Sequence, residues 1–214
     1  MGQVVALATL LNEHRVWRGQ PVPRRRAQQP TGHAALDDAL PEGGWPDAAL
    51  TELLLPVDGV GELRLLLPTL ARLTQAGQPV VLVAPPYLPF PAGWRQGGVD
   101  LAHLHLMDAA PRDALWAAEQ CLRAGCTGAV LAWPRAASGM PVDDRALRRL
   151  QVAADSGRGL GFVFRDLRAA ANPSPAALRL AIDGTPPKLR VIKCRGGMPP
   201  ARTFDLPGAF AGAN

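Results

Sequence analysis

The chain has few of the residues that metal, disulfide and nucleophilic sites need. Its 214 residues include three cysteines and four histidines, and their spacing fits neither a metal site nor a Ser-His-Asp group. It has no apolar run near the roughly 18 residues of a membrane span, and its first ten residues lack the basic region of a secretory signal. We therefore expect a soluble cytoplasmic protein without a metal site and without membrane contact.

Aromatic residues are scarce as well. The chain has one Tyr, five Phe and five Trp. Stacking of nucleic-acid bases needs exposed aromatic rings, whereas most tryptophans pack in cores or interfaces. We therefore interpret the tryptophans as packing residues rather than as a platform for bases.

Charge is distributed unevenly along the chain. The net charge is +5, but residues 1–30 carry five Arg and one Glu, and residues 185–214 carry five Lys or Arg and one Asp. The segment between them holds 13 basic and 16 acidic residues. Basic ends suit contact with nucleic acid or with an acidic partner, and they equally suit a role in solubility. The sequence leaves both interpretations open.

Strand and helix patterns alternate from residue 31 onward, and the chain is long and apolar enough for one sizeable core. A short helix containing Asp37 and Asp38 comes first, with Leu36 and Leu40 packing inward. Apolar runs predict strands at 50–55, 78–84, 104–107, 128–133, 161–164 and 189–193. Helical spacing predicts helices at 63–73, 112–124 and 143–155, with a kink at Pro68. This alternation predicts an α/β fold, with a mostly parallel sheet covered by helices on both faces.

Composition divides the chain into three parts. Residues 1–30 combine a short apolar pattern over 4–12 with a Pro- and Arg-rich stretch, which we interpret as an N-terminal helix and a basic linker arm. Residues 31–200 form the predicted core, and residues 201–214 form a C-terminal tail. The apolar residues and the arginines of the arm are candidates for partner binding: Leu7, Leu10, Leu11, Trp17, Arg24, Arg25 and Arg26.

The stretch 53–64, LLLPVDGVGELR, has the strand, glycine turn and helix of a phosphate-binding loop. A working loop reads G-x-x-x-x-G-K-[ST], because its backbone N–H groups, its Lys and its hydroxyl hold the phosphates and Mg²⁺. Aligned on Gly61, the first Gly is replaced by Pro56, the Lys by Glu62 and the Ser/Thr by Leu63. A carboxylate repels a triphosphate, and a leucine cannot bind a metal ion.

Residues 31–195 resemble the core of RecA, with its P-loop NTPase-type fold. The similarity lies in the order TG, LD, AL, GGWP and LTEL before the loop, and in GGVDLAHLHLMDAAPRDALWAAEQCLRAG after it. The resemblance implies that a Walker B aspartate should end GAVLAW, where Trp133 stands, and that a catalytic Glu should follow QPVVLVA, where Pro86 stands. We interpret the site as degenerate, with no cofactor and no ATP hydrolysis, and with Trp133 filling the vacated volume. Its positions are Pro56, Gly59, Gly61, Glu62, Leu63, Pro86 and Trp133.

Four segments further resemble the ImuA family: VWRG (16–19), GGWP (43–46), LTEL (50–53) and RGGMP (195–199). This resemblance implies a non-catalytic accessory protein of SOS-induced translesion DNA synthesis. The implied partners are RecA, an ImuB-type Y-family-like protein and, through it, an error-prone DNA polymerase III alpha subunit. Two alternatives stay open: a SulA-type cell-division inhibitor acting on FtsZ, and a residual nucleotide- or DNA-binding ATPase.

Two further surfaces are candidates for binding. Basic residues that can contact DNA phosphates are Arg145, Arg148 and Arg149 on one predicted helix, with Lys193 and Arg195 near the C-terminus. A solvated helix face gives the same arginine spacing. The stretch PPYLPFPAGW (85–94) lacks the repeat of a polyproline ligand, so we interpret it as a loop that crosses the cleft, with a docking surface as the alternative.

Overall fold

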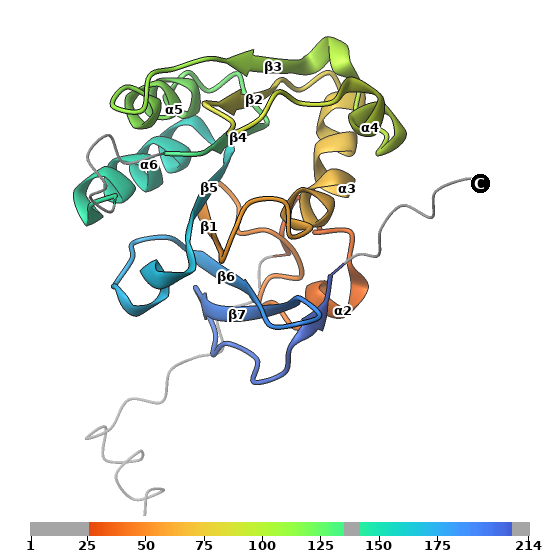
Figure 1. Ribbon diagram of the computed structural model, residues 1–214, viewed down its shortest axis with the longest axis vertical. Coiled ribbons are helices and arrows are strands. Elements are labelled where there is room, and N and C mark those ends of the chain that lie inside the picture. The colour runs from red at the N-terminus through yellow and green to blue at the C-terminus, as the bar shows by residue number, and fades with distance from the viewer. Residues whose placement is uncertain (1–25, 135–141, 207–214) are drawn as a thin grey trace, which may run out of the picture.

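The computed structural model describes residues 26–134 and 142–206, which form one eight-stranded sheet in the order β3-β2-β4-β5-β1-β6-β7-β8 (Figure 1). The strands are β1 (Leu50–Leu55), β2 (Val80–Val83), β3 (Leu104–Met107), β4 (Ala129–Ala132), β5 (Leu160–Asp166), β6 (Leu178–Asp183), β7 (Lys188–Cys194) and β8 (Phe204–Asp205). Strands β1 to β6 pair in parallel, whereas β7 and β8 pair antiparallel. The predicted mostly parallel sheet is confirmed.

Helices lie on both faces of this sheet (Figure 1). The helices are α2 (Ala34–Asp37), α3 (Glu62–Gln75), α4 (Pro91–Gln96), α5 (Ala114–Arg123) and α6 (Asp144–Gly157), with short 3-10 helices η1 (Leu101–His103) and η2 (Leu167–Ala171). Helices α5 and α6 pack against each other and against one face, while α2, α3 and α4 lie on the other. Among the described residues, no helix has both the length and the hydrophobicity of a membrane span.

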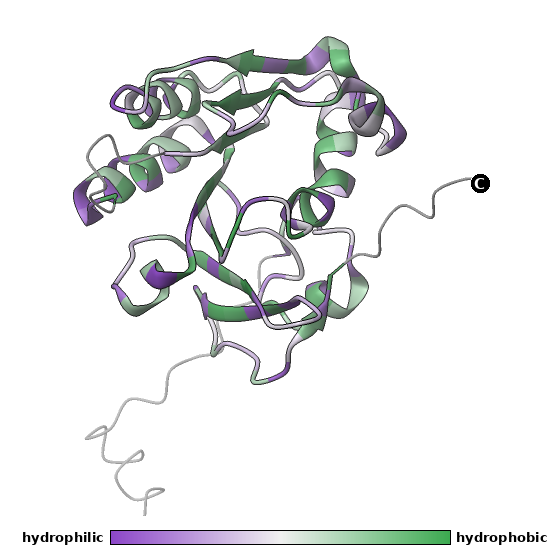
Figure 2. Ribbon diagram, in the orientation of Figure 1, coloured by the Kyte–Doolittle hydropathy of each residue, from purple (hydrophilic) through white to green (hydrophobic). Residues whose placement is uncertain are grey.

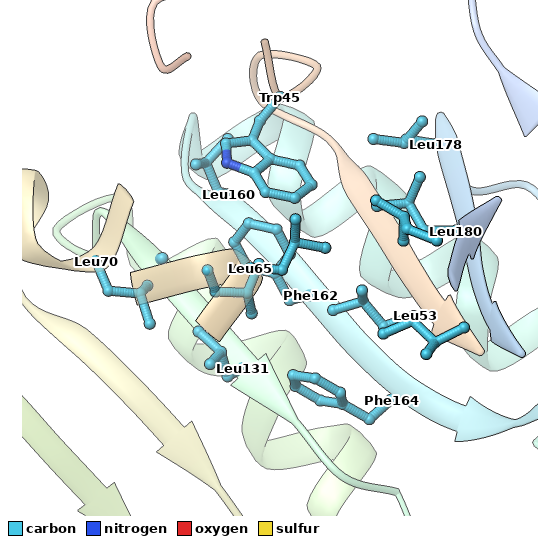
Figure 3. Packing of buried hydrophobic residues seen from close by; sticks show 14 of the residues in the cluster. Trp45, Leu53, Leu65, Leu70, Leu131, Leu160, Phe162, Phe164, Leu178 and Leu180 are labelled. Carbon is cyan, nitrogen blue, oxygen red and sulfur yellow. The ribbon is translucent and has the colours of Figure 1, made fainter. Parts of the chain in front are cut away.

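The larger part of the core lies between the sheet and α3. Every residue of β1, β2 and β4 is buried, because these strands are covered on both faces. Trp45 is fully buried and meets Phe162 edge to face, with ring centroids 5.1 Å apart (Figure 3). Its indole Nε1 donates a hydrogen bond to the Thr69 hydroxyl at 2.8 Å. Figure 2 shows the hydrophobic residues running along the strands, with hydrophilic residues mainly in loops and on parts of the helices.

The predicted short helix before β1 is confirmed. Leu36 and Leu40 are buried, as the pattern predicts. The Asp37 carboxylate accepts a hydrogen bond from the Thr31 backbone N–H at 2.8 Å, whereas Asp38 is exposed. One aspartate therefore fixes the turn and the other lies on the surface.

Residues 27–30, within the predicted arm, hydrogen-bond to the turn that precedes β1. The Ala27 N–H donates to the Glu42 carbonyl at 2.8 Å, and the Trp45 N–H donates to the Gln29 carbonyl at 2.9 Å. The Thr69 hydroxyl donates to the Pro30 carbonyl at 3.1 Å. This short segment is therefore packed on the core. Arg26 is exposed, and the other candidate arm residues lie outside the described part of the chain: Leu7, Leu10, Leu11, Trp17, Arg24 and Arg25.

The structure also contains elements that the sequence patterns did not predict. Strand β6 has a charged residue, Arg179, in the middle of its apolar run, and this hides the strand pattern. Strand β8 has only two residues. The stretch 85–94, predicted as a loop, turns into helix α4 at Pro91, because proline presets the backbone angle of a first helical residue.

Three charged side chains are buried together at the centre of the sheet. Glu52 of β1 is fully buried, and its carboxylate contacts Arg165 of β5 at 2.6 Å and Arg179 of β6 at 2.5 Å. Both arginine side chains are only 5% exposed. Charge-assisted hydrogen bonds of this kind are strong, and they offset part of the large cost of removing the charges from water.

The remaining guanidinium N–H groups of this triad bind backbone carbonyls. Arg165 donates to Val142 at 3.0 Å, at the start of the segment that leads into α6. Arg179 donates to Ala169 at 2.8 Å and to Asn172 at 3.0 Å. The triad therefore connects the three strands β5, β1 and β6 to η2 and to the entry of α6.

Replacement of Glu52 tests how much the triad contributes to the free energy of unfolding. Glu52→Gln leaves two buried guanidiniums without a carboxylate, so we expect the free energy of unfolding to fall by about 3–5 kcal/mol. Urea denaturation followed by circular dichroism measures the change. The matched control is Glu42→Gln in the turn before β1, where we expect a change within about 0.5 kcal/mol. Equal effects of the two substitutions would contradict the assignment of the triad as a central support.

Candidate functional site

The degenerate loop lies where ligands bind in open α/β sheets. Residues 56–61 connect the carboxyl end of β1 to the N-terminus of α3, and β1 lies between β5 and β6. Gly59 and Gly61 have φ angles of 85° and 106°. Only glycine adopts such angles without strain, so these two positions preserve the sharp turn of the loop.

Glu62 is the first residue of α3, and its carboxylate folds back over the loop. Its side chain is buried, and Oε1 accepts a hydrogen bond from the Gly59 backbone N–H at 3.2 Å. The other carboxylate oxygen is buried and has no hydrogen-bond partner among the described residues. The N-terminus of a helix offers free N–H groups and a positive dipole end, which favour an anion. The chain therefore places a carboxylate of its own where a phosphate-binding loop would hold its ligand.

A cleft of about 330 Å³ opens beside this loop. Its walls come from the loop, from the chain after β2 and β4, and from the end of β5: Leu55, Pro56, Val57, Asp58, Pro86, Trp133, Pro134, Phe164, Arg165 and Asp166. The structure thus brings the predicted positions Pro56, Pro86 and Trp133 together. Gly59, Glu62 and Leu63 line a neighbouring groove that also includes Pro86 and Trp133.

Trp133 follows β4 directly and occupies the space between the cleft and the groove. Its side chain is only 6% exposed, and it stacks on Phe164 with ring centroids 4.2 Å apart and an angle of 4° between the rings. Its backbone N–H donates to the Val83 carbonyl at 3.2 Å. The indole therefore covers the carboxyl ends of β4 and β5, where the resemblance to RecA places a Walker B residue.

The charged groups of the cleft are Asp58, Asp166 and Arg165. The Arg165 guanidinium is already bound to Glu52 and to the Val142 carbonyl. The Asp166 carboxylate accepts a hydrogen bond from the Arg168 N–H at 2.7 Å. This hydrogen bond caps the N-terminus of η2. Within the described ranges, no group of three or more His, Cys, Asp or Glu side chains could hold a metal ion.

The candidate DNA contacts fall into two separate groups (Figure 1). On α6, Arg148 pairs with Asp144 at 3.0 Å and Arg149 with Glu119 at 3.3 Å, while Arg145 is exposed. Two of the three arginines therefore take part in local ion pairs.

The other group lies at β7. The Lys193 ammonium donates to the Ser174 carbonyl at 2.7 Å. Arg195 is exposed and, with Arg158, lines a pocket of about 760 Å³ at the amino ends of the parallel strands, on the edge opposite to the cleft. The five candidate residues therefore lie on α6 and at the end of β7.

Sequence reasoning missed the triad of Glu52, Arg165 and Arg179. The signal was present, because each residue interrupts an apolar run: LTELLL, GFVFRD and LRLAID. A charge inside a run that is buried on both faces predicts a buried partner. The partners themselves lie more than 100 residues away in sequence, at separations of 113 and 127 residues.

Comparisons with known proteins give a likeness among solved structures. No family model matches the chain, and no curated protein matches it. Among solved structures, the chain is similar to the crystal structure of SulA from Pseudomonas aeruginosa, with 27% sequence identity and a TM-score of 0.44 over 56% of this chain and 98% of that one. At this TM-score the likeness carries no argument about function. The RecA-like α/β fold follows from the strand order, the parallel pairing and the helices on both faces.

Truncation of Trp133 tests its role as a filler of the cleft. Trp133→Ala removes a buried, stacked indole, so we expect the free energy of unfolding to fall by about 3–5 kcal/mol in urea denaturation. The matched control is Trp116→Ala on α5, because that indole is 63% exposed. An unchanged midpoint for Trp133→Ala would show that the indole does not support the fold.

Proposed function

We propose that the chain is a non-catalytic, RecA-like accessory protein of SOS-induced translesion DNA synthesis, and that it acts by binding other proteins. The observation that carries this proposal is the position of the Glu62 carboxylate, which occupies the N-terminus of α3 and accepts the Gly59 N–H. The loop retains its turn but presents a negative charge to any incoming phosphate. A nucleotide would meet electrostatic repulsion at the place where it needs a cation.

The surroundings of the loop support the same conclusion. Leu63 replaces the hydroxyl that would bind Mg²⁺, and Pro86 and Trp133 line the cleft at the positions expected for a catalytic Glu and a Walker B Asp. Phosphoryl transfer needs charge neutralisation, a metal ion and a positioned nucleophile together. Restoring the residue for one of these three requirements therefore leaves the other two unmet.

The proposed partners come from the resemblance of four segments to the ImuA family. They are RecA, an ImuB-type protein and, through it, an error-prone DNA polymerase III alpha subunit, with DNA as a further possible ligand. The excess of arginines in the arm supports binding to an acidic partner, since opposite charges on two proteins increase the rate of encounter. The packed position of residues 27–30 leaves residues 1–26 as the part of the arm proposed for this contact.

Restoring the lysine tests whether the site retains catalytic capacity. We expect Glu62→Lys to show no ATPase activity, because Leu63 and Trp133 still deny Mg²⁺ and water their positions. Phosphate release, measured against the Glu62→Gln variant and a protein-free blank, gives the result. Turnover above the blank in Glu62→Lys would contradict the degenerate site and support the ATPase alternative.

Capture from DNA-damaged bacterial cells tests the accessory function. We expect the tagged full-length chain to recover RecA and an ImuB-type protein, identified by mass spectrometry. Deletion of residues 1–25 leaves the hydrogen-bonding groups of residues 27–30 in the chain and should reduce RecA recovery at least about tenfold. Recovery of FtsZ without RecA or polymerase subunits would contradict the proposal and support a cell-division inhibitor.

A further inference from the structure

Three large apolar side chains are exposed on the loop that lies beside the degenerate site. The loop 85–90 joins β2 to α4, and Tyr87, Leu88 and Phe90 are 70%, 86% and 73% exposed. Single exposed apolar residues are common, but three within four positions mark an interaction surface. Ala84, directly before the loop, has a φ of 50°, which is unfavourable for alanine. This strained backbone conformation lies where the chain leaves β2, and strain of this kind persists only where the surrounding structure holds the backbone in place.

A groove of about 300 Å³ lies between this loop and α3. We call it the loop groove. Its apolar lining includes Leu63, Leu67, Leu82, Trp94 and Trp133, and the exposed side chains of the loop stand at its rim. Trp94 and Trp133 are buried within the fold, so these walls are held in place by the core. Preformed apolar grooves with aromatic walls bind the side chains of a partner segment at low entropic cost.

The accessible charge at the loop groove is positive. Arg64 of α3 lines it, and Arg95, which follows the lining residue Trp94 in α4, is exposed next to the lining without being part of it; neither arginine forms an ion pair with any other described residue. Residues 85–99 contain no Asp or Glu. The Glu62 carboxylate also faces the groove, but it is buried and bound to the Gly59 N–H. The rim therefore complements a ligand that carries acidic residues.

We propose that the loop groove binds a segment of a partner protein that presents bulky apolar side chains flanked by Asp or Glu. This inference rests on the proposed function, because it names a surface through which such a chain would act. The apolar side chains enter the groove and supply most of the affinity, while the acidic residues pair with Arg64 and Arg95 and fix the orientation. A second copy of this chain fits less well, because a two-fold contact between the same grooves brings equally charged rims together.

Two synthetic amphipathic peptides, about four helical turns long, provide the probe. Both carry Leu and Phe at the same helical positions, and the remaining positions are Asp and Glu in one and Lys in the other. We expect the acidic peptide to bind the full-length chain at least about tenfold more tightly at low salt, and the difference to shrink as salt rises. Fluorescence anisotropy of the labelled peptides measures both affinities.

Three variants locate the binding. Leu88→Ser should weaken binding of the acidic peptide about tenfold or more, whereas Met198→Ser, a control side chain that is 90% exposed elsewhere, should leave it unchanged. Arg64→Glu combined with Arg95→Glu should reverse the preference toward the Lys peptide. Urea denaturation of each variant verifies that the fold is retained, since all four positions are at the surface or at the rim.

Equal binding of both peptides, or unchanged binding by Leu88→Ser, would overturn the proposal. A wild-type dimer that becomes monomeric in Leu88→Ser would also overturn it, because the occupant would then be a second copy. Capture from damaged cells separates this inference from the proposed function. If wild type and Leu88→Ser recover every translesion partner equally, the groove proposal fails and the accessory function stands; if neither recovers a translesion partner, the function itself fails.

Discussion

One buried carboxylate, Glu52, sets the arrangement on which the candidate site depends. It neutralises one of two buried arginines and leaves a net positive charge inside the sheet, stabilised by backbone carbonyls. Strand β1 ends three residues after Glu52 and the loop follows it directly, and Arg165 both binds Glu52 and lines the cleft. The ion pairs of Glu52 with Arg165 and Arg179 therefore hold β5, β1 and β6 together next to the cleft, in addition to apolar packing.

The loop after β1 has the turn of a phosphate-binding loop, but a side chain of the protein lies where the phosphate would bind. Glycines at positions 59 and 61 keep the turn, and α3 still begins at the end of it. The anion that belongs at such a helix N-terminus is supplied by the side chain of Glu62. Trp133 and Phe164 stack over the ends of β4 and β5. The fold thus places its own side chains where a phosphate-binding loop would hold a ligand, and the apolar side chains beside them form the loop groove.

The sequence predicts the elements that coincide with apolar runs between turns and fails where tertiary contacts decide. Strands β1 and β3 have the predicted bounds, because apolar runs between turns need no distant information. Strand β6 was missed because the role of Arg179 depends on a carboxylate in β1. The degenerate loop positions follow from spacing alone, whereas the backward fold of Glu62 and the exposure of Tyr87, Leu88 and Phe90 depend on packing that no local pattern contains.

The hydrogen bonds of residues 27–30 place the junction of the arm and the core at the amino ends of the parallel strands. Gln28, Gln29 and Asp47 share a pocket there with residues that precede β2 and β4. The loop groove lies at the carboxyl ends, so the two surfaces are separated by at least the length of β1, about 20 Å. A partner held where the arm joins the core and a partner held in the groove would therefore not compete for space. Bound to one rigid sheet, each would raise the local concentration of the other.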